Sequence, residues 1–588
     1  MHVSPGIQLL AKTVCGLLTP SAIIVLLSKV SDKYYDITIP EWMLWTSCIL
    51  SAPFLATCAV WRIILWERYR AWRLGAQPLP RLKGKWIGDI DFLVSLFKAS
   101  KHGYFYEPLW NATDTISSTI DTFSLWEHDI ITCNPEIIKI VLATDFDNYV
   151  KGPVFHYANE SVLGSGVFNV DGDLWKFHRG MSRPYFSRER ISHLDMFDKH
   201  ADTAINKMRK RFLEGHAVNF QDLVARFTLD SATEFLFGSC VNSLASELPH
   251  SVTETKSSID ASQTNQAEEF AEAWTEAQIV LADRTLLQGV WPFTEILRDR
   301  TRQPMKIVND YVEPILKNVL AKDSQSRNTN VHKSEEDDTL LGHLVKETKD
   351  VNILRDETLN IMIAGRDTTA ACLTYCIYFL CMYPNACERL RSEILGLLGP
   401  ESRPTLEDIR ELKYLRAFIN ETLRLFPPVP WNSRSTVKET TWPNPDPNGK
   451  PFYIPANANV SWSVFMMHRR EEYWGPDVEE FDPDRFLDER LHKYIVPNPF
   501  VFLPFNGGPR ICLGQQFAYN EISFFLVRLL QQFESMELDA AAQPPSARPP
   551  AEWQTSQKLR VRSERIRPKQ HLTSYIEGGL WVRMKEAV

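Results

Sequence analysis

The sequence predicts a mainly α-helical fold with small β-sheets, in which one large domain follows an N-terminal membrane anchor. Three observations support this prediction. Two apolar stretches open the chain of 588 residues. Most of the remainder shows the apolar spacing of amphipathic helices. Strand-like runs are short and few, at Phe452–Ile454 and Leu580–Val582. The length suits a single large domain with appendages.

The composition excludes several classes of protein. Hydrophobic residues make up 44% of the chain and aromatic residues 11%, which is enough for a large core. A formal net charge of −8 argues against a nucleic-acid partner. The 10 cysteines form no regular framework and no Cys-x-x-Cys, so structural zinc is not expected. Cys372 and Cys376 lie one helical turn apart among apolar residues, which predicts core packing.

The first 77 residues are predicted to be the membrane anchor, and residues 78–588 the catalytic domain. The stretch from Trp42 to about Trp66 is long enough to span a bilayer, and tryptophans mark both of its edges. The earlier stretch, about 7–27, contains Lys12 and Pro20, so it can be a second span, a surface helix or part of a signal-like sequence. The span is followed by a run of basic residues: Arg68, Arg70, Arg73, Arg81, Lys83 and Lys85. The positive-inside rule therefore places the domain in the cytosol with one span or two.

Short polar or proline-rich segments divide the rest of the chain. Pro78-Leu-Pro80 follows the anchor and is typical of a stiff linker. Three polar stretches are expected to be surface insertions, at residues 254–269, 322–339 and 540–552.

The segment from Asp356 to Met382 is predicted to form one long apolar helix that ends before Pro384. Adjacent Asp367 and Thr368 in its middle compete for backbone hydrogen bonds, and Gly365 costs about 1 kcal/mol relative to alanine. Such broken local rules are typical of functional sites. A bulge at Gly365 would open a groove beside the helix. The Thr368 hydroxyl would face this groove, and Asp367 would bring protons to it from solvent. The alternative is a kinked core helix whose threonine bonds to its own backbone.

A carboxylate and a guanidinium lie one helical turn apart at Glu421 and Arg424, before the helix-stopping Phe426-Pro-Pro. A third charge, Arg485, lies in the proline-containing loop Phe481–Phe486. Taken alone, Glu-x-x-Arg is an ordinary surface ion pair.

A glycine-rich loop near the C-terminus suits a thiolate ligand of a haem iron. Gly508 and Gly514 allow backbone N–H groups to approach the Cys512 sulfur, and the helix expected from near Leu513 points its positive end at the same atom. Arg510 can reach a haem propionate, while Phe505 can pack over the ring face. A lone cysteine before a helix is usually inert, but the longer pattern favours the ligand. The loop reads Phe505-Asn-Gly-Gly508-Pro-Arg510-Ile-Cys512-Leu-Gly514.

This loop resembles the haem-binding signature of the cytochrome P-450 superfamily, and the resemblance extends from about Pro80 to the end of the chain. It implies a single cytochrome P-450-type domain with haem b bound through Cys512. It also implies that Glu421, Arg424 and Arg485 form one buried network that supports the haem core, and that Asp367 and Thr368 deliver protons. Trp175, Arg179, Arg434 and Arg510 are the residues expected to hold the propionates. His468 is either a further propionate ligand or a structural histidine.

Two segments are similar to a fungal branch of alkane and fatty-acid hydroxylases and to enzymes of wood-decay fungi that oxidise terpenoids or xenobiotics. The first is Arg366-Asp-Thr-Thr369 with the Cys512 loop, and the second runs from Trp442 to Arg470. The pocket is expected at residues 162–167, 361–369, 429–432 and 577–579. No cationic clamp for a substrate carboxylate is apparent.

We therefore predict a haem-thiolate monooxygenase of the endoplasmic reticulum membrane that inserts one oxygen atom of O2 into an apolar small molecule. No dinucleotide fingerprint occurs, so we expect electrons from NADPH to arrive through a separate flavin reductase. Cytochrome b5 is a candidate for a further partner. A peroxide-using or isomerising haem-thiolate enzyme is an alternative, although it would have no use for a proton relay. A non-catalytic haem-binding sensor is a third hypothesis.

Overall fold

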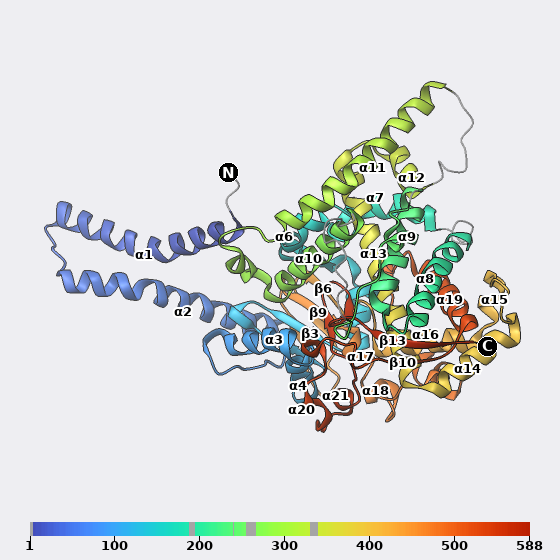
Figure 1. Cartoon of the computed structure of the whole chain (residues 1–588). Helices are drawn as coiled ribbons and strands as arrows, with labels where there is room; N and C mark the ends of the chain where they lie inside the picture. Colours follow the sequence, from blue (N-terminus) through green and yellow to red (C-terminus); the bar gives the residue numbers. More distant parts are fainter. Residues whose placement is uncertain (1–3, 187–193, 239, 255–265, 330–338, 588) are drawn as a thin grey trace.

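Helices form most of the chain, and the two N-terminal ones stand apart from the others as a hairpin (Figure 1). The structure, a computed structural model, describes residues 4–186, 194–238, 240–254, 266–329 and 339–587. The longer helices are α1 (Pro5–Tyr35), α2 (Glu41–Arg73), α3 (Ile90–His102), α4 (Glu107–Thr115), α6 (Gly152–Leu163), α7 (Gly172–Ser182), α8 (Asp195–Leu213), α9 (Phe220–Phe237), α10 (Gln266–Leu287), α11 (Arg302–Thr329), α12 (Leu340–Glu347), α13 (Val351–Met382), α14 (Pro384–Leu398), α16 (Lys413–Leu425) and α19 (Gln515–Gln532). The shorter ones are α5 (Pro135–Lys139), α15 (Leu406–Glu411), α17 (Val464–Met467), α18 (Glu471–Trp474), α20 (Ala551–Gln554) and α21 (Leu559–Arg562).

Both helices of the hairpin are long and apolar enough to cross a membrane. Their interior prolines, Pro20 and Pro53, do not interrupt them. The N-terminal end of α1 returns to the domain, where Ser4 donates a hydrogen bond to the Ile296 carbonyl. Gly6 packs there against the backbone of the short 3₁₀ helix η8 (Gln288–Glu295), and a Cβ at Gly6 would overlap the carbonyl oxygen of Pro292. Both ends of the hairpin therefore contact the domain.

Charged side chains fix α2 to the domain that follows it. Arg70 pairs with Glu439. The Arg81 guanidinium lies 2.7 Å from a Glu67 oxygen and 3.2 Å from an Asp121 oxygen, and it stacks over the Phe123 ring. Glu67 is buried although it belongs to an anchor helix. Arg81 thus joins a carboxylate of α2 to one of strand β2 (Thr119–Asp121). The hairpin therefore cannot turn freely relative to the domain.

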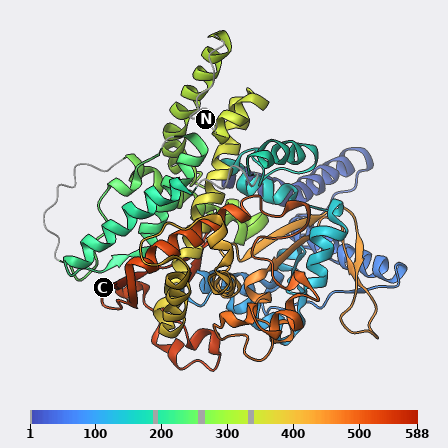
Figure 2. The same cartoon turned by 90° about the vertical axis from the view of Figure 1, so that its right-hand side faces the viewer.

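Four small sheets lie beside the helices (Figure 2). The largest has the order β2-β3-β9-β6-β4, in which β3 and β9 are parallel and β9 and β6 antiparallel. The others have the orders β1-β8-β7, β10-β13-β5 and β11-β12. The strands are β1 (Gln77–Pro78), β2 (Thr119–Asp121), β3 (Asp129–Thr132), β4 (Tyr149–Val150), β5 (Val218–Asn219), β6 (Trp431–Thr436), β7 (Thr440–Trp442), β8 (Phe452–Ile454), β9 (Asn459–Ser463), β10 (Phe533–Leu538), β11 (Pro568–Gln570), β12 (Ser574–Ile576) and β13 (Trp581–Glu586).

Helix α13 forms the centre of the core. It is buried along most of its length and packs against α9, α16 and α19. The predicted end at Met382 is confirmed, whereas the helix begins earlier than expected, at Val351. The reason is local, because the Asp350 side chain accepts hydrogen bonds from the backbone N–H groups of Asn352 and Ile353.

The strand predictions were close. Strand β8 covers Phe452–Ile454 as predicted, while β13 begins one residue later than expected and extends to Glu586. Of the predicted surface insertions, residues 255–265 and 330–338 lie outside the described part of the chain. The third is not wholly at the surface, because Ala542 and Ala547 are buried.

Candidate haem-thiolate site

An internal cavity of about 900 Å³ lies between the Cys512 loop and α13. All four predicted pocket segments contribute to its wall, through residues such as Leu163, Ala364, Val429 and Glu577. The wall also includes Ile63 of α2, which lies outside the predicted pocket segments. The cavity therefore extends from the glycine-rich loop to the membrane hairpin.

The loop around Cys512 is held by its own backbone. The Cys512 N–H donates to the Phe505 carbonyl and the Ile511 N–H to that of Gly508, both at 3.0 Å. The side chain of Cys512 faces the cavity, and Phe505 lines it while packing against Tyr519. The surrounding protein raises the pKa of the Cys512 thiol, which the Gly514 N–H and the nearby Arg179 partly offset. Helix α19 begins at Gln515, two residues later than expected.

The two glycines of this loop have different tasks. The Gly514 N–H points at the Cys512 sulfur as predicted. Gly508 instead has a φ of +66°, and a Cβ there would overlap the Leu142 carbonyl oxygen. Glycine at 508 is thus explained by a left-handed turn pressed against a neighbouring backbone, rather than by an approach to sulfur.

The three arginines predicted to hold the propionates lie at one side of the cavity, together with Trp175. Arg179, from α7, donates to the Ile511 carbonyl at 2.9 Å. Arg510 donates to Asp171 at 2.8 Å and stacks over Trp175, which comes from the same turn of α7 as Arg179. Arg434 of β6 is buried, and its Nε atom has no hydrogen-bond acceptor. Burial lowers the pKa of Arg434 to about 9 and that of Arg510 to about 10.

A fourth cation, Lys151, was missed from the sequence. It lines the same part of the cavity, and no carboxylate among the described residues forms an ion pair with it. Burial, Arg434 and Arg510 hold its pKa well below the ordinary value. Asp171 fixes this segment by accepting from the N–H groups of Lys151 and Gly152. No local motif marks Lys151, because only the fold brings it to the arginines.

This cluster fits a haem. Its buried cations outnumber the carboxylates, since Asp171 is the only acidic group that pairs with them among the described residues. An unpartnered Arg434 nitrogen is costly unless an anion fills the space. The two propionates of a haem whose iron faces Cys512 would supply that charge.

The structure of the segment around Gly365, Asp367 and Thr368 differs from the prediction. α13 is continuous α-helix through Gly365, so the predicted bulge is absent. Thr368 lines the cavity, and its hydroxyl donates to the Ala364 carbonyl at 2.6 Å, as the alternative interpretation expected. Asp367 does not line the cavity. Its carboxylate accepts from Gln278 of α10 at 2.8 Å and lies 3.3 Å from Arg366.

Glu421, Arg424 and Arg485 lie in one buried network. Arg424 binds Glu421 through two nitrogens, at 2.7 and 2.8 Å, and neither side chain is exposed to solvent. Arg485 Nε lies 3.6 Å from a Glu421 oxygen, and Asp477 provides a second carboxylate for Arg485 at 3.0 Å. These residues do not line the cavity, so their arrangement is that of a support.

His468 belongs to this support and does not line the cavity. Its Nδ1 lies 3.2 Å from the Arg424 carbonyl oxygen, and its Nε2 accepts from the Leu503 N–H at 3.0 Å. Burial lowers the pKa of His468 to about 3, so the ring is neutral. Of the two expectations for this residue, the structure matches the structural histidine, which joins the Glu-x-x-Arg helix to the chain just before the Cys512 loop.

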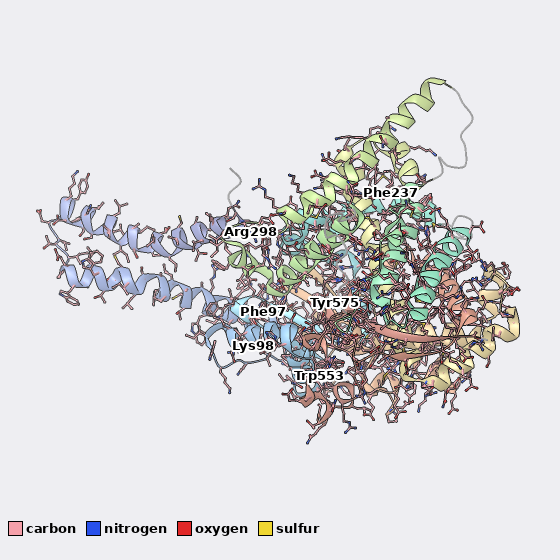
Figure 3. The ribbon with its side chains drawn as sticks, in the orientation of Figure 1. Phe97, Lys98, Phe237, Arg298, Trp553 and Tyr575 are labelled. Atoms are coloured by element: carbon pink, nitrogen blue, oxygen red, sulfur yellow. The ribbon has the colours of Figure 1, made fainter. Side chains whose placement is uncertain are left out.

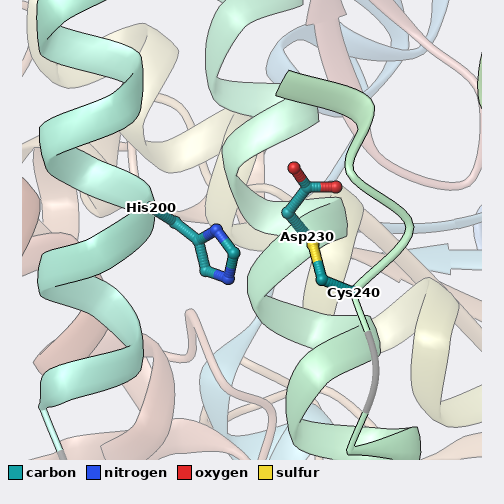
Figure 4. Close-up of side chains that lie close together, drawn as sticks. All are labelled: His200, Asp230 and Cys240. Carbon is teal, nitrogen blue, oxygen red and sulfur yellow. The ribbon is translucent and has the colours of Figure 1, made fainter. Parts of the chain in front are cut away.

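Two clusters outside the cysteine loop contain side chains of the types that bind metals. His200, Asp230 and Cys240 approach one another between α8, α9 and the loop after α9 (Figure 4). Asp230 accepts from the Ser243 and Leu244 N–H groups, and His200 pairs with Glu234 at 2.7 Å. The second cluster, Glu67, Asp121 and His128, surrounds Arg81. Both sets are accounted for by structural contacts.

Comparison with known proteins identifies the architecture. A family model described as Cytochrome P450 matches residues 89–560. Cytochrome P450 52A3-B of Candida maltosa is 34% identical over 543 residues, covering 88% of this chain and 96% of the relative. Cytochrome P450 52A10 of the same yeast is 38% identical, with 80% and 85% covered. Cytochrome P450 52-M1 of Starmerella bombicola is 36% identical, with 70% and 76% covered. These matches confirm the predicted resemblance to the fungal branch of alkane and fatty-acid hydroxylases.

Proposed function

The chain belongs to the cytochrome P450 family and is a monooxygenase, and from this premise we propose that it hydroxylates long aliphatic substrates, either fatty acids or alkanes. A terpenoid or a polycyclic xenobiotic is the alternative class. The observation that carries the proposal is the single cavity that joins Cys512 and Thr368 to an apolar wall reaching α2. The resemblance of the segment Arg366–Thr369 and of the Cys512 loop to alkane and fatty-acid hydroxylases supports the aliphatic class, and the relatives share the group number 52 among the cytochromes P450.

We assign Cys512 as the residue that would bind the haem iron, and Trp175, Arg179, Arg434, Arg510 and Lys151 as the residues that would hold the propionates. When bound, the haem supplies a thiolate-ligated iron at which dioxygen is activated. The Gly514 N–H stabilises the negative charge on the Cys512 sulfur. Phe505 covers one side of the site, and the buried network of Glu421, Arg424 and Arg485 keeps the loop in place.

Protons for the reaction are assigned to Thr368 and Asp367. Thr368 lines the cavity, and because its hydroxyl proton is donated to the Ala364 carbonyl, the hydroxyl oxygen keeps its lone pairs as acceptors. Asp367 is held by Gln278 and Arg366 behind it. A rotation of the Asp367 side chain away from Gln278 would bring a proton from the outer side of α13 to the Thr368 oxygen.

We propose that electrons come from NADPH through a separate flavin reductase that docks on the face near Cys512, with cytochrome b5 as a possible second donor. One oxygen atom then enters a C–H bond and the other leaves as water, with two electrons from NADPH.

The location is proposed as the endoplasmic reticulum membrane, with residues 1–77 as anchor and residues 78–588 in the cytosol. The two apolar helices and the basic residues after them support this topology.

The experiment that tests the substrate class uses microsomes that contain this protein and a fungal reductase. NADPH is supplied with equimolar dodecanoic acid and a rigid tricyclic terpenoid, and the products are identified by mass. Hydroxylated dodecanoic acid is the expected result. Oxidised terpenoid beside unchanged acid would contradict the aliphatic assignment and indicate a broad pocket.

A further inference from the structure

A buried lysine lies in the cavity wall, away from the propionate cluster. Lys569 of β11 is 5% exposed and lines the cavity. Its Nζ donates to the carbonyl oxygens of Ser100, at 2.6 Å, and Lys101, at 2.7 Å, at the C-terminal end of α3. An ammonium group has three N–H donors, so one remains after these two bonds.

No carboxylate forms an ion pair with this ammonium in the described part of the chain. The two acidic residues nearby already have cationic partners, because Glu577 pairs with Arg567 at 3.2 Å and Asp283 pairs with both Lys101 and Arg300. Burial lowers the pKa of Lys569 to about 8, so the amine is still mostly protonated at neutral pH. A buried ammonium bonded only to neutral carbonyls favours the arrival of an anion.

That anion is not a haem propionate. The charges that act on Lys151 are Arg434, Arg510 and Asp171. The charges that act on Lys569 are Glu577, Arg567 and Lys101. The two sets share no member. The hydrogen bonds agree, because the Lys569 ammonium binds the end of α3, whereas Asp171 holds the segments of Lys151 and Arg510.

The position of Lys569 is toward the membrane hairpin. The carbonyls that hold its ammonium belong to the end of α3, and Figure 3 shows Phe97 and Lys98 of this helix beside the base of the hairpin. Lys569 is paired across β11–β12 with Tyr575. Apolar side chains, among them Phe92, Leu96 and Ile361, line the cavity that this end shares with Cys512.

We propose that Lys569 binds the carboxylate of a long-chain acid whose apolar tail extends through the cavity toward Cys512. The inference rests on the proposed function, which it narrows from aliphatic substrates in general to acids. An alkane has no group to satisfy the third N–H of Lys569. Binding of the carboxylate at the hairpin end would present the opposite end of the chain for oxidation.

The test compares two ligands that differ only in their polar end, dodecanoic acid and dodecan-1-ol. Their dissociation constants are measured at pH 7 from the optical spin-state change of the haem protein, for wild type and the variants Lys569→Met and Lys569→Arg. Lys98→Met is the matched control, because Lys98 is an exposed lysine of α3 that does not line the cavity. The carbon-monoxide difference spectrum shows for each variant that the haem site is intact.

For Lys569→Met we expect the dissociation constant of the acid to rise about 10- to 100-fold, the range for loss of a hydrogen bond to a charged group. That of the alcohol should change less than about twofold, so that the ratio of the two constants carries the result. Lys569→Arg should restore most of the affinity for the acid, and Lys98→Met should resemble wild type.

Equal weakening of both ligands in Lys569→Met would overturn the inference, because Lys569 would then only shape the β11–β12 hairpin. An unchanged affinity for the acid would overturn it as well. If wild type binds and oxidises the alcohol but prefers it to the acid, this inference fails while the aliphatic proposal stands. If wild type with an intact haem spectrum binds neither ligand, both fail.

Discussion

Single residues in this protein divide into those that face the cavity and those that hold the others in place. Motifs on one short segment, such as Ala364–Ala370, could be found from the sequence because each residue type there is unusual for a helix. Lys151 and Lys569 could not, because an isolated lysine has no local signature. Lys569 is held by backbone carbonyls, and Lys151 lies near the charges of Arg434 and Arg510. These partners lie hundreds of residues away in the sequence.

Thr368 permits a sharp test of the proton assignment. We expect Thr368→Ala to retain NADPH oxidation while product formed per NADPH falls by about 100-fold, the lower limit for loss of a positioned proton donor. Thr374→Ala is the matched control, since Thr374 makes the same bond to the carbonyl four residues earlier, at 2.7 Å, but does not line the cavity. The measurement is the ratio of product and hydrogen peroxide to NADPH consumed. Unchanged coupling in Thr368→Ala would remove this threonine from the relay.

His468 makes stability depend on pH in a stated direction. Its pKa is lowered to about 3 from the ordinary 6.5, so between these values the unfolded chain binds a proton that the folded chain does not. Stability is therefore lost as the pH falls from about 6.5 toward 3, by about 1.4 kcal/mol for each pH unit. Buried His571, with a pKa of about 4, acts in the same direction.

We expect His468→Gln to remove one proton's share of this dependence. The free energy of unfolding in detergent is measured by denaturant titration at pH 6.5 and 5.5. Its difference between the two pH values should be smaller in the variant by about 1 kcal/mol, because the unfolded histidine is already half protonated at pH 6.5. An identical difference in both proteins would mean that His468 is protonated or hydrated in the folded state.

At the scale of elements, the sequence predicts best where local chemistry decides. Strand β8 and the end of α13 were placed correctly because turn residues and a proline delimit them. The absence of a bulge at Gly365 was not predictable, since it depends on the space beside the helix. The nearest atom to a Cβ there would be that of Ala232, at 3.6 Å, so nothing forces the backbone apart. The Glu-x-x-Arg pair likewise gave no sign of its complete burial.

Burial decides what the Glu421–Arg424 pair contributes. Removal of one partner leaves an unpaired charge without solvent, so Glu421→Ala should destabilise the domain by about 3–5 kcal/mol. Arg389→Ala is the control, because Arg389 binds Asp484 with similar geometry, at 2.7 and 2.8 Å, but at the surface. It should cost less than about 1 kcal/mol. Denaturant unfolding followed by the haem spectrum distinguishes the two, and equal small losses would contradict a supporting role for the buried pair.

At the scale of the whole molecule, the N-terminal hairpin determines the orientation of the chain. The sequence left open one span or two, whereas among the described residues both N-terminal helices are long and apolar enough to cross a membrane. Because α1 and α2 are antiparallel neighbours, both ends of the hairpin reach the same side, beside the domain.

This arrangement predicts the side of the N-terminus. Epitope tags placed before residue 1 and after residue 588 should both be digested when protease is added to intact microsomes, because both would face the cytosol. A protected N-terminal tag beside a digested C-terminal tag would indicate a single span. A lumenal marker protein that survives the protease is the control for sealed vesicles.

The contact between Gly6 and the η8 backbone, together with Ile63 in the cavity wall, gives the anchor a second task. A form of the protein without residues 1–77 would keep the Cys512 loop but lose these contacts. Removal of the hairpin would take Ile63 out of the cavity wall and expose η8 to solvent. A leader borrowed from another protein would keep the enzyme on the membrane and still alter what it oxidises. Residues 1–77 should therefore be kept with the domain wherever the complete wall of the cavity is needed.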